Sequence, residues 1–441
     1  MTVPGQSIQG AICWGGVHAT MIEDGTKLDG APALSQGRGR AAFGFIFVSA
    51  VASAMSIGIM VPILPNLLKQ FSGGDTATAS EWNVTFAVAG GLMSFFAGPV
   101  LGLLSDRFGR RPVLLISLVG FGTDFLFMAF APSLWWLFLG RLISGATSGI
   151  FSTANAYVAD VTAPENRARA FGWMGSAFSF GFLAGPAIGG LLGNYNLRWP
   201  FMAAAALTLV NAFYGLLVLP ESLPENRRAT SFRWRRANPL GSLTLLRSHH
   251  ELLPLAGVGS LNQLANMVWP SVFVLYTGYR YHWTPGTTGF VMMGGSVLGI
   301  VVQSFLVGPA VQRLGERGCM FAGAASAACA LFWYSMAPTG LIYLIGMPLS
   351  ALWGLLIPGL QGLMTRRVGP TEQGQLQGAN QSLIGISSVV GPLLYGLSFA
   401  WAVRHPDYSF SGLPMFLASA TMMACLALAF WAARRAERYV S

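Results

Sequence analysis

Long apolar segments alternate with short polar stretches along most of the chain. Each is close to the roughly 20 residues that a helix needs to cross the hydrocarbon core of a bilayer. Six come first, a polar, Arg-rich stretch at 221–250 follows, and six more come after it. Their approximate ranges are 42–68, 83–104, 112–131, 134–159, 170–192, 199–219, 252–277, 287–308, 319–337, 340–364, 374–402 and 412–433. The pattern predicts an all-α membrane protein with twelve transmembrane helices in two pseudo-symmetric halves of six.

The same pattern divides the chain into five parts. We expect a flexible cytoplasmic N-terminal extension at 1–41, an N-terminal six-helix half at 42–219, a cytoplasmic linker at 220–251, a C-terminal six-helix half at 252–435 and a cytoplasmic tail at 436–441.

The composition supports lipid as the surrounding solvent. Hydrophobic residues make up 53% of the chain, charged residues make up 10%, and the mean hydropathy is +0.56. A soluble domain carries roughly 25% charged residues, so this chain has too few polar groups to cover its surface against water. The net charge of +10 does not indicate a nucleic-acid partner, because the basic residues stand in short clusters between the apolar segments.

The positions of the basic residues predict how the chain is oriented in the membrane. With the N-terminus inside, 21 of the 26 Lys and Arg residues fall in cytoplasmic segments. Four fall outside, namely Lys69, Arg198, Arg280 and Arg404, and the last, Arg141, lies within an apolar segment. Because Lys and Arg accumulate in cytoplasmic loops, we expect both termini in the cytoplasm.

The two halves are related by a repeat at a fixed offset of 206 residues. Gly102, Arg107, Gly109, Arg111, Gly140, Pro164, Gly172, Gly185, Pro186 and Gly190 fall on Gly308, Arg313, Gly315, Arg317, Gly346, Pro370, Gly378, Gly391, Pro392 and Gly396. Ten identities at one ungapped offset, two of them prolines, indicate a duplicated six-helix unit. Parallel repeats of this kind are a transporter architecture, with the substrate site between the halves near the membrane midplane.

Several motifs resemble those of a known family. The run GLLSDRFGRR from Gly102 to Arg111 resembles the signature loop of the major facilitator superfamily. The glycines and the proline between Gly181 and Gly190 look like its antiporter motif, and the run from Gly58 to Pro65 resembles its drug:proton antiporter branch. Within that branch the likeness to tetracycline-resistance exporters covers about residues 42–435, and it is carried by Gly140-Arg141, Asp160, Glu165-Asn166-Arg167, Gln263 to Thr277, Gln303 and Gly359-Leu360-Gln361-Gly362.

The resemblance implies a secondary active transporter that exports an amphipathic drug or small organic compound by alternating access, in exchange for protons. A tetracycline-like compound is one candidate. The partners implied are the small molecule, protons and the lipid of a bacterial inner (plasma) membrane, with no cofactor and a monomeric chain. One departure bears on the substrate, because those exporters carry an aspartate where this chain has Ser53. The alternative is a uniporter or symporter of a small metabolite without drug efflux, since fold does not fix function.

Two charged residues are placed at bilayer depth, Asp124 in the third segment and Arg141 in the fourth. Each lies about eight residues from the turn that joins these segments, so at 1.5 Å per residue both are roughly 12 Å inward, which predicts an ion pair. A charge at this depth costs between about 3 and 15 kcal/mol, which favours a functional role. Asp124 is either a proton carrier tuned by Arg141 or half of a static structural pair. The repeat places Ala330 and Met347 at the equivalent positions, so this chemistry belongs to the N-terminal half alone.

Polar side chains form stripes at helical spacing on otherwise apolar segments. In the resembling family the first, fourth, seventh and tenth helices line the central cavity. The candidate cavity residues are Ser53, Ser148, Asn155, Asn262, Gln263, Asn266, Trp269, Gln303, Trp353 and Gln361. The amides favour a cavity because they are costly against lipid. The serines fit tight helix packing equally well, and the tryptophans also fit anchors at the membrane interface.

The third group of candidates forms a conformational switch, for which the alternative is a loop that only sets topology. It comprises Gly102, Asp106, Arg107, Gly109, Arg111, Asp160, Gly185, Pro186, Gly189 and Gly190. We expect Asp106 to meet the start of the eleventh helix, after Pro370-Thr371-Glu372, where free N–H groups and the helix dipole favour an anion. Arg107 or Arg111 is expected to pair with Asp160 when the cytoplasmic side is closed. The glycines allow close helix approach, and Pro186 can bend its helix.

The sequence does not indicate an enzyme or a metal protein. The only two lysines, Lys27 and Lys69, lack a Gly-Lys-Ser/Thr context, so no phosphate-binding loop is evident. The four cysteines show neither CxxC nor Cys/His spacing, so we expect no metal site and no disulfide framework. His249-His250, beside Glu251, is too isolated for a metal or catalytic group.

Overall fold

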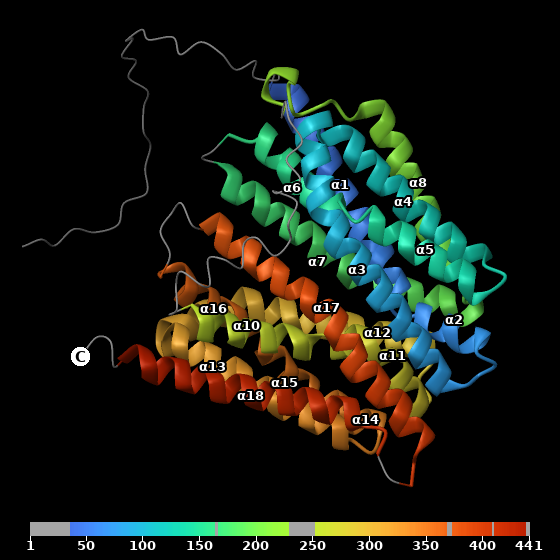
Figure 1. Ribbon diagram of the computed structural model, residues 1–441, viewed down its shortest axis with the longest axis vertical. Coiled ribbons are helices and arrows are strands. Elements are labelled where there is room, and N and C mark those ends of the chain that lie inside the picture. Colours follow the sequence, from blue (N-terminus) through green and yellow to red (C-terminus); the bar gives the residue numbers. More distant parts are fainter. Residues whose placement is uncertain (1–35, 164–165, 229–251, 368–372, 408–409, 438–441) are drawn as a thin grey trace, which may run out of the picture.

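The computed structural model describes residues 36–163, 166–228, 252–367, 373–407 and 410–437, and every regular element within these ranges is helical. Two helical bundles follow one another along the chain (Figure 1). The first contains α1 (Gln36–Met60), α2 (Leu64–Phe71), α3 (Thr76–Phe108), α4 (Arg110–Phe130), α5 (Leu134–Ala146), α6 (Ile150–Val161), α7 (Arg167–Tyr195), α8 (Trp199–Val218) and the short η2 (Glu225–Arg227).

The second bundle contains α10 (Leu253–Asn266), α11 (Val268–Tyr281), α12 (Pro285–Val301), the π-helical turn η5 (Val302–Leu306), α13 (Val307–Met336), α14 (Gly340–Ile345), α15 (Met347–Ala351), the 3-10 turn η6 (Leu352–Leu355), α16 (Leu356–Thr365), α17 (Gln373–Arg404) and α18 (Leu413–Glu437). Apolar segments of this length form helices in lipid because a helix satisfies all its backbone hydrogen bonds internally.

Ten helical stretches within the described ranges are long and apolar enough to cross a membrane, where the sequence predicts twelve. One stretch, Pro285–Met336, is 52 residues long and covers two predicted segments. The predicted segment 252–277 corresponds to α10 and α11, which are 14 residues each and meet at Met267. The difference therefore arises where helices run together or break.

Two glycines mark equivalent turns in the two bundles. Gly109 separates α3 from α4 with φ at 104°, and Gly315 interrupts the long α13 helix with φ at 70°. Residues with a Cβ atom rarely adopt positive φ. The two glycines are related by the offset of 206, so the repeat extends to backbone conformation.

The first turn of α3 is fixed by Asp75. Its carboxylate accepts hydrogen bonds from the backbone N–H groups of Ala77 and Thr78, at 3.2 and 3.0 Å. These contacts satisfy N–H groups that the helix itself leaves unpaired. The hydrogen bonds from Thr78, its side chain first, hold the pKa of Asp75 below its usual value.

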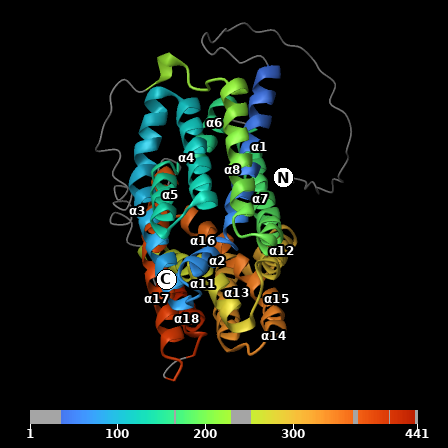
Figure 2. The same ribbon diagram turned by 90° about the vertical axis from the view of Figure 1, so that its right-hand side faces the viewer.

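The bundles are packed together at one end of the molecule, which we call the Glu81 end. There α3 packs against α17 and α7 against α12, neighbours in both views (Figures 1 and 2). Glu81 forms an ion pair with Arg404, with Arg404 Nη2 donating to Glu81 Oε2 at 2.9 Å. Asn194 Oδ1 accepts from the N–H of Gly286 at 2.9 Å. Each contact joins one bundle to the other.

The apolar core, like these polar contacts, joins the two bundles at the Glu81 end. The largest buried cluster combines first-bundle residues such as Phe86 and Phe201 with second-bundle residues such as Tyr276 and Phe399. A separate cluster around Leu114 contains first-bundle residues only. It lies toward the opposite end, which carries Arg110 and which we call the Arg110 end. The core is continuous between the bundles at the Glu81 end.

Candidate functional site

A buried ion pair joins α4 and α5. Asp124 is 0% exposed, and its carboxylate pairs with the guanidinium of Arg141, whose Nε donates to Asp124 Oδ1 at 3.2 Å. Gly140 permits this approach, since a Cβ there would stand 2.8 Å from Asp124 Oδ1. The pairing predicted from equal depth is confirmed, whereas the role of the pair stays a prediction.

Arg141 also borders a cavity of about 270 Å³. Ser144 lines it one turn further along α5, Val61 closes it from the end of α1, and Pro270 reaches it from α11 of the other bundle. Asp124 is not among its lining residues, so within the described chain the arginine stands between the buried carboxylate and the open space. Any change in the charge of Asp124 would be felt first by the arginine.

A larger cavity, of about 620 Å³, lies mostly in the second bundle. Asn262, Asn266, Trp269 and Trp353 line it, as the sequence predicts. Val61 and Pro270 line both cavities, so the large cavity and the Arg141 cavity adjoin. The volume of the large cavity falls within the range typical of sites for drug-sized molecules.

Six other candidate cavity residues lie outside the large cavity. Ser148 lines a third cavity of about 590 Å³, which shares Gly91 and Ser94 with the Arg141 cavity. Gln303 is exposed within the π-helical turn η5 and does not line the large cavity. The remaining four, which border none of these three cavities, are Ser53, Asn155, Gln263 and Gln361.

Ser53 belongs to the packing face of α1. On either side of it along that face, Ser49 donates to Asn211 Oδ1 at 2.9 Å, and the hydroxyl of Thr208 donates to Ser56 at 3.1 Å. Ser53 is 2% exposed and its hydroxyl has no hydrogen-bond partner. The placement of Ser53 in the cavity is therefore wrong, because this serine face of α1 packs against α8.

The sequence singled out only Trp269 of the aromatic wall that borders the large cavity. Tyr334 and Tyr343 stack with ring centroids 4.1 Å apart, and Trp269 meets Tyr334 edge-on at 5.7 Å. Phe273 completes this wall. Aromatic residues at helical spacing usually indicate core packing, so no sequence signal separated Phe273, Tyr334 and Tyr343 from other buried rings.

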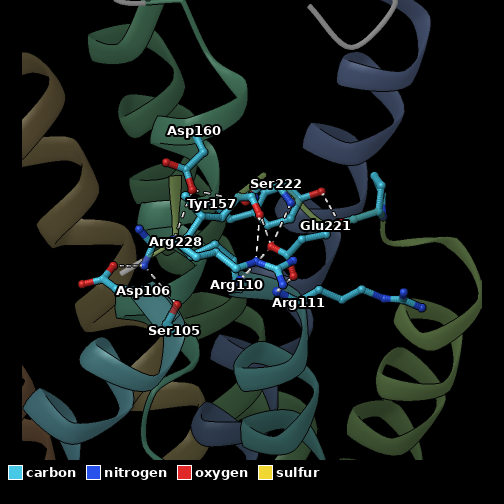
Figure 3. Close-up of polar contacts among 11 residues, drawn as sticks. Ser105, Asp106, Arg110, Arg111, Tyr157, Asp160, Glu221, Ser222 and Arg228 are labelled. Carbon is cyan, nitrogen blue, oxygen red and sulfur yellow. Dashed lines mark hydrogen bonds and ion pairs between the residues drawn. The ribbon is translucent and has the colours of Figure 1, made fainter. Parts of the chain in front are cut away.

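At the Arg110 end, a polar cluster joins α3, α4 and α6 (Figure 3). Arg110 contacts Asp106 at 2.5 Å, Asp160 at 3.1 Å and the hydroxyl of Ser105 at 3.1 Å. In this structure Arg110 holds the position beside Asp160, and the pairing of Arg107 or Arg111 with Asp160 in a closed state stays a prediction.

The neighbouring arginines point elsewhere. The guanidinium of Arg107 lies over the ring of Phe108, 5.4 Å from its centroid, and Arg111 Nη2 donates to the carbonyl of Leu216 at 2.6 Å. All the contacts of the Arg110 cluster that Figure 3 marks lie within the first bundle, so the cluster does not require closure between the bundles, contrary to expectation. The expected contact of Asp106 with 370–372 lies outside the described residues.

Glu221, which the sequence assigned to the linker, completes this cluster. Its carboxylate accepts from the backbone N–H groups of Arg110 and Arg111 at 2.8 and 3.2 Å, and also from those of Ser222 and Leu223. It therefore caps the first turn of α4, where the helix dipole favours an anion. Tyr157 donates to the carbonyl of Pro220 at 2.9 Å and holds the segment in place.

The glycines of α7 face two different neighbours. A Cβ at Gly185 would stand 2.6 Å from the carbonyl of Met55 in α1, and a Cβ at Gly189 would stand 2.3 Å from the carbonyl of Ile59. Gly190 instead meets Pro285 of α12, and the carbonyl of Pro186 meets Gly289. The motif thus packs α7 against its own bundle and against the other one. At Gly102 a Cβ would meet nothing within 4 Å.

Comparison with known proteins agrees with this geometry. The profile of the Major Facilitator Superfamily matches residues 46–392. Tetracycline resistance protein, class C, of Escherichia coli is 37% identical to this chain, and the alignment covers 85% of this chain and 92% of that protein. The class B protein of the same organism is 33% identical, and the alignment covers 80% of this chain and 87% of that protein. The resemblance read from the motifs is confirmed.

A solved structure adds evidence on the fold alone. A bacterial homolog of the human lysosomal transporter Spinster, in an inward-facing and unoccupied conformation, aligns with a TM-score of 0.73 at 13% identity. The alignment covers 91% of this chain and 98% of that one.

Proposed function

We propose that this chain, which belongs to the Major Facilitator Superfamily, is a secondary transporter that exports an amphipathic aromatic drug in exchange for protons. The relatives named for tetracycline resistance support drug export. The twelve predicted helices are retained in this proposal, with α10 and α11 as one broken span and Pro285–Met336 as two spans that meet near Gly315.

One observation carries the proposal: a drug-sized cavity adjoins a buried ion pair. Val61 and Pro270 separate the large cavity from the space beside Arg141, and Arg141 is paired with the buried Asp124. A drug in the one cavity and a proton on Asp124 would therefore act on the same wall between the bundles. Exchange transport needs such a link between its two substrates.

The proposed cycle starts with Asp124 ionised and held by Arg141. A proton that reaches Asp124 removes its charge, weakens its hold on Arg141, and frees the guanidinium to move toward the adjoining cavity. That movement would change the contacts across Val61 and Pro270 and disfavour the bound drug. The proton and the drug then occupy the protein alternately as the bundles rock about the site.

The basic residues support an orientation with both termini in the cytoplasm of a bacterial inner membrane. In that orientation the Glu81 end faces outward and the Arg110 end opens toward the cytoplasm, and we propose that the protein works as a monomer. A cysteine placed at Gly73, in a background without the native cysteines, should react with a membrane-impermeant maleimide from outside only. Labelling from the cytoplasmic side only would reverse the orientation.

Inverted vesicles with an acidic lumen test the transport reaction. Vesicles containing the protein should accumulate tetracycline or another fluorescent drug against its gradient, lose it on addition of a protonophore, and show no response to ATP. Vesicles without the protein are the control. Equilibration without accumulation would instead indicate a uniporter, and drug uptake that is driven only by a proton gradient of opposite sign would indicate a symporter.

A further inference from the structure

The large cavity is bordered by a buried polar group that lacks a partner. Tyr343 lines the cavity, is 1% exposed, and its hydroxyl makes no hydrogen bond with any described residue. An unsatisfied buried hydroxyl destabilises the folded state, so a ligand that bonds to it would recover that cost. The hydroxyl of the adjacent Tyr334, by contrast, already donates to Ser350 at 3.0 Å.

The same cavity presents an amide donor. Asn262 Oδ1 accepts from the indole N–H of Trp353 at 2.6 Å. Because an indole N–H only donates, this contact fixes which end of the amide faces Trp353 and leaves the NH₂ group as the free end. Asn262 therefore offers hydrogens to a ligand oxygen from the cavity wall, and the hydroxyl of Tyr343 is a second, buried donor without a partner among the described residues.

The electrostatics of the cavity disfavour a cation. None of the described residues that line it is Asp, Glu, Lys or Arg. The charged residue that lines the adjoining cavity, Arg141, is positive. The rings of Tyr334 and Tyr343 stack on each other, which covers one face of each. The cavity thus has hydrogen-bond donors and a positive neighbour, with no carboxylate.

We propose that this cavity takes a planar aromatic compound that carries carbonyl or phenolate oxygens and no net positive charge. The inference rests on the proposed function, because it assigns the substrate class to the same cavity.

Binding to the purified protein tests the substrate class without any transport. Resorufin and oxonine are suitable probes, because they share one tricyclic frame, the first with carbonyl and phenolate oxygens and the second with amino groups and a positive charge. Resorufin should bind at least about tenfold more tightly. Tyr343→Phe should weaken resorufin binding up to about tenfold. Tyr281→Phe is the matched control, since its hydroxyl is bonded to the carbonyl of Ala337 and does not line the cavity.

Equal or tighter binding of oxonine, binding of neither dye, or an unchanged affinity in a folded Tyr343→Phe variant would each overturn the substrate class. Selective resorufin binding by a protein that does not accumulate drug in inverted vesicles would overturn the export reaction and leave the substrate class intact.

A second inference comes from the Arg110 end, where the repeat reverses a charge pair. Arg110 pairs with Asp160 at 3.1 Å in the first bundle, and Glu316 pairs with Arg366 at 2.8 Å in the second. The offset of 206 maps Arg110 onto Glu316 and Asp160 onto Arg366. The two pairs are therefore equivalent in position and opposite in sign.

Both pairs lie at the same end of the molecule. Helix α3 runs from the Glu81 end to the Arg110 end, and α17 starts shortly after Arg366 and ends at Arg404, the partner of Glu81. In a pseudo-two-fold arrangement, closure of this end would bring each residue toward its own equivalent. Because the signs are reversed, each acid would meet a base.

We propose that Asp160 and Arg366 form an ion pair between the bundles when the Arg110 end closes. These are the more exposed members of their pairs, with side chains 25% and 76% exposed against 14% for Arg110 and 17% for Glu316. They have the surface available to reach across, while Arg110 and Glu316 stay with their own bundles. This inference rests on alternating access.

Charge exchange distinguishes a contact between bundles from the local pairs. Asp160→Arg and Arg366→Asp should each lower the closed population about fivefold, and the double exchange should restore it. The double exchange breaks both local pairs. If Asp160 and Arg366 acted only within their own bundles, the double variant would therefore have the smallest closed population of the three variants. Closure is measured by the distance between spin labels at Phe108 and Leu314, equivalent exposed positions, in a cysteine-free background. A double variant with a smaller closed population than either single variant would contradict the proposal.

The distance between the two spin labels should change with drug, with pH or among the variants. If it stays the same under all of these conditions, alternating access itself is contradicted. The two failures are therefore distinguishable.

Discussion

The two halves of this protein contain equivalent cavities with different chemistry. At the offset of 206, the cavity residues Met60, Phe86, Gly90, Arg141 and Ser144 correspond to Asn266, Met292, Ser296, Met347 and Ser350, and the first set lines the small cavity while the second lines the large one. Where the first half has Arg141 paired with Asp124, the second has Met347 and the fully buried Ala330.

The difference shows how one scaffold can serve two substrates. A charged pair in a bilayer needs a small, tightly packed site, because each charge must keep its partner. A drug needs volume, apolar walls and a few hydrogen bonds. Replacing the pair by alanine and methionine leaves a larger and uncharged space in the second half. We therefore expect the first half to carry the proton and the second half to bind the drug.

The largest expected effect comes from giving the first half the chemistry of the second. Arg141→Met leaves Asp124 buried without a partner, which should destabilise the protein by about 3–5 kcal/mol. The double variant Asp124→Ala with Arg141→Met copies the Ala330 and Met347 pair and should regain most of that loss. Thermal unfolding in detergent measures both. A single variant as stable as the wild type would mean that the pair is not needed for folding.

A smaller loss is expected where α7 packs against α1. Gly185→Val would place its Cβ 2.6 Å from the carbonyl of Met55, and such overpacking costs about 1–3 kcal/mol. Gly172→Val in the same helix is the control, because its Cβ would meet nothing within 4 Å. The midpoint of thermal unfolding should fall for the first variant only. Equal midpoints would show that α1 and α7 separate easily at this position.

The smallest effect on stability is expected at Asp106, whose side chain is 48% exposed. Asp106→Asn removes the charge next to Arg110 and should slow efflux about tenfold while substrate binding and expression are retained, because the anion biases one conformer. The repeat supplies a control in Gln312→Asn, which should transport normally. Normal efflux by Asp106→Asn would indicate a loop that only sets topology.

The sequence predicted what depends on depth, spacing and repetition. The pairing of Asp124 with Arg141 followed from helix rise, and four cavity residues of the second half followed from amides and tryptophans in apolar segments. It missed what depends on side-chain direction. Arg107, Arg110 and Arg111 are close in sequence but point to different neighbours, and only the turn at Gly109 decides which one meets Asp160. Tyr343 was missed because a buried tyrosine within an apolar segment is typical of a core, and its unpaired hydroxyl is visible only in three dimensions.

The most direct test of the division between halves is transport by Asp124→Asn in proteoliposomes. The amide keeps the shape of the carboxylate and cannot carry a proton. With an imposed pH gradient, the wild type should accumulate drug against its gradient, whereas Asp124→Asn should fail to do so and still exchange labelled for unlabelled drug at equal concentrations. Folded yield is checked first. Uphill accumulation by Asp124→Asn at the wild-type rate would contradict the account, since the proton would then have to be carried elsewhere.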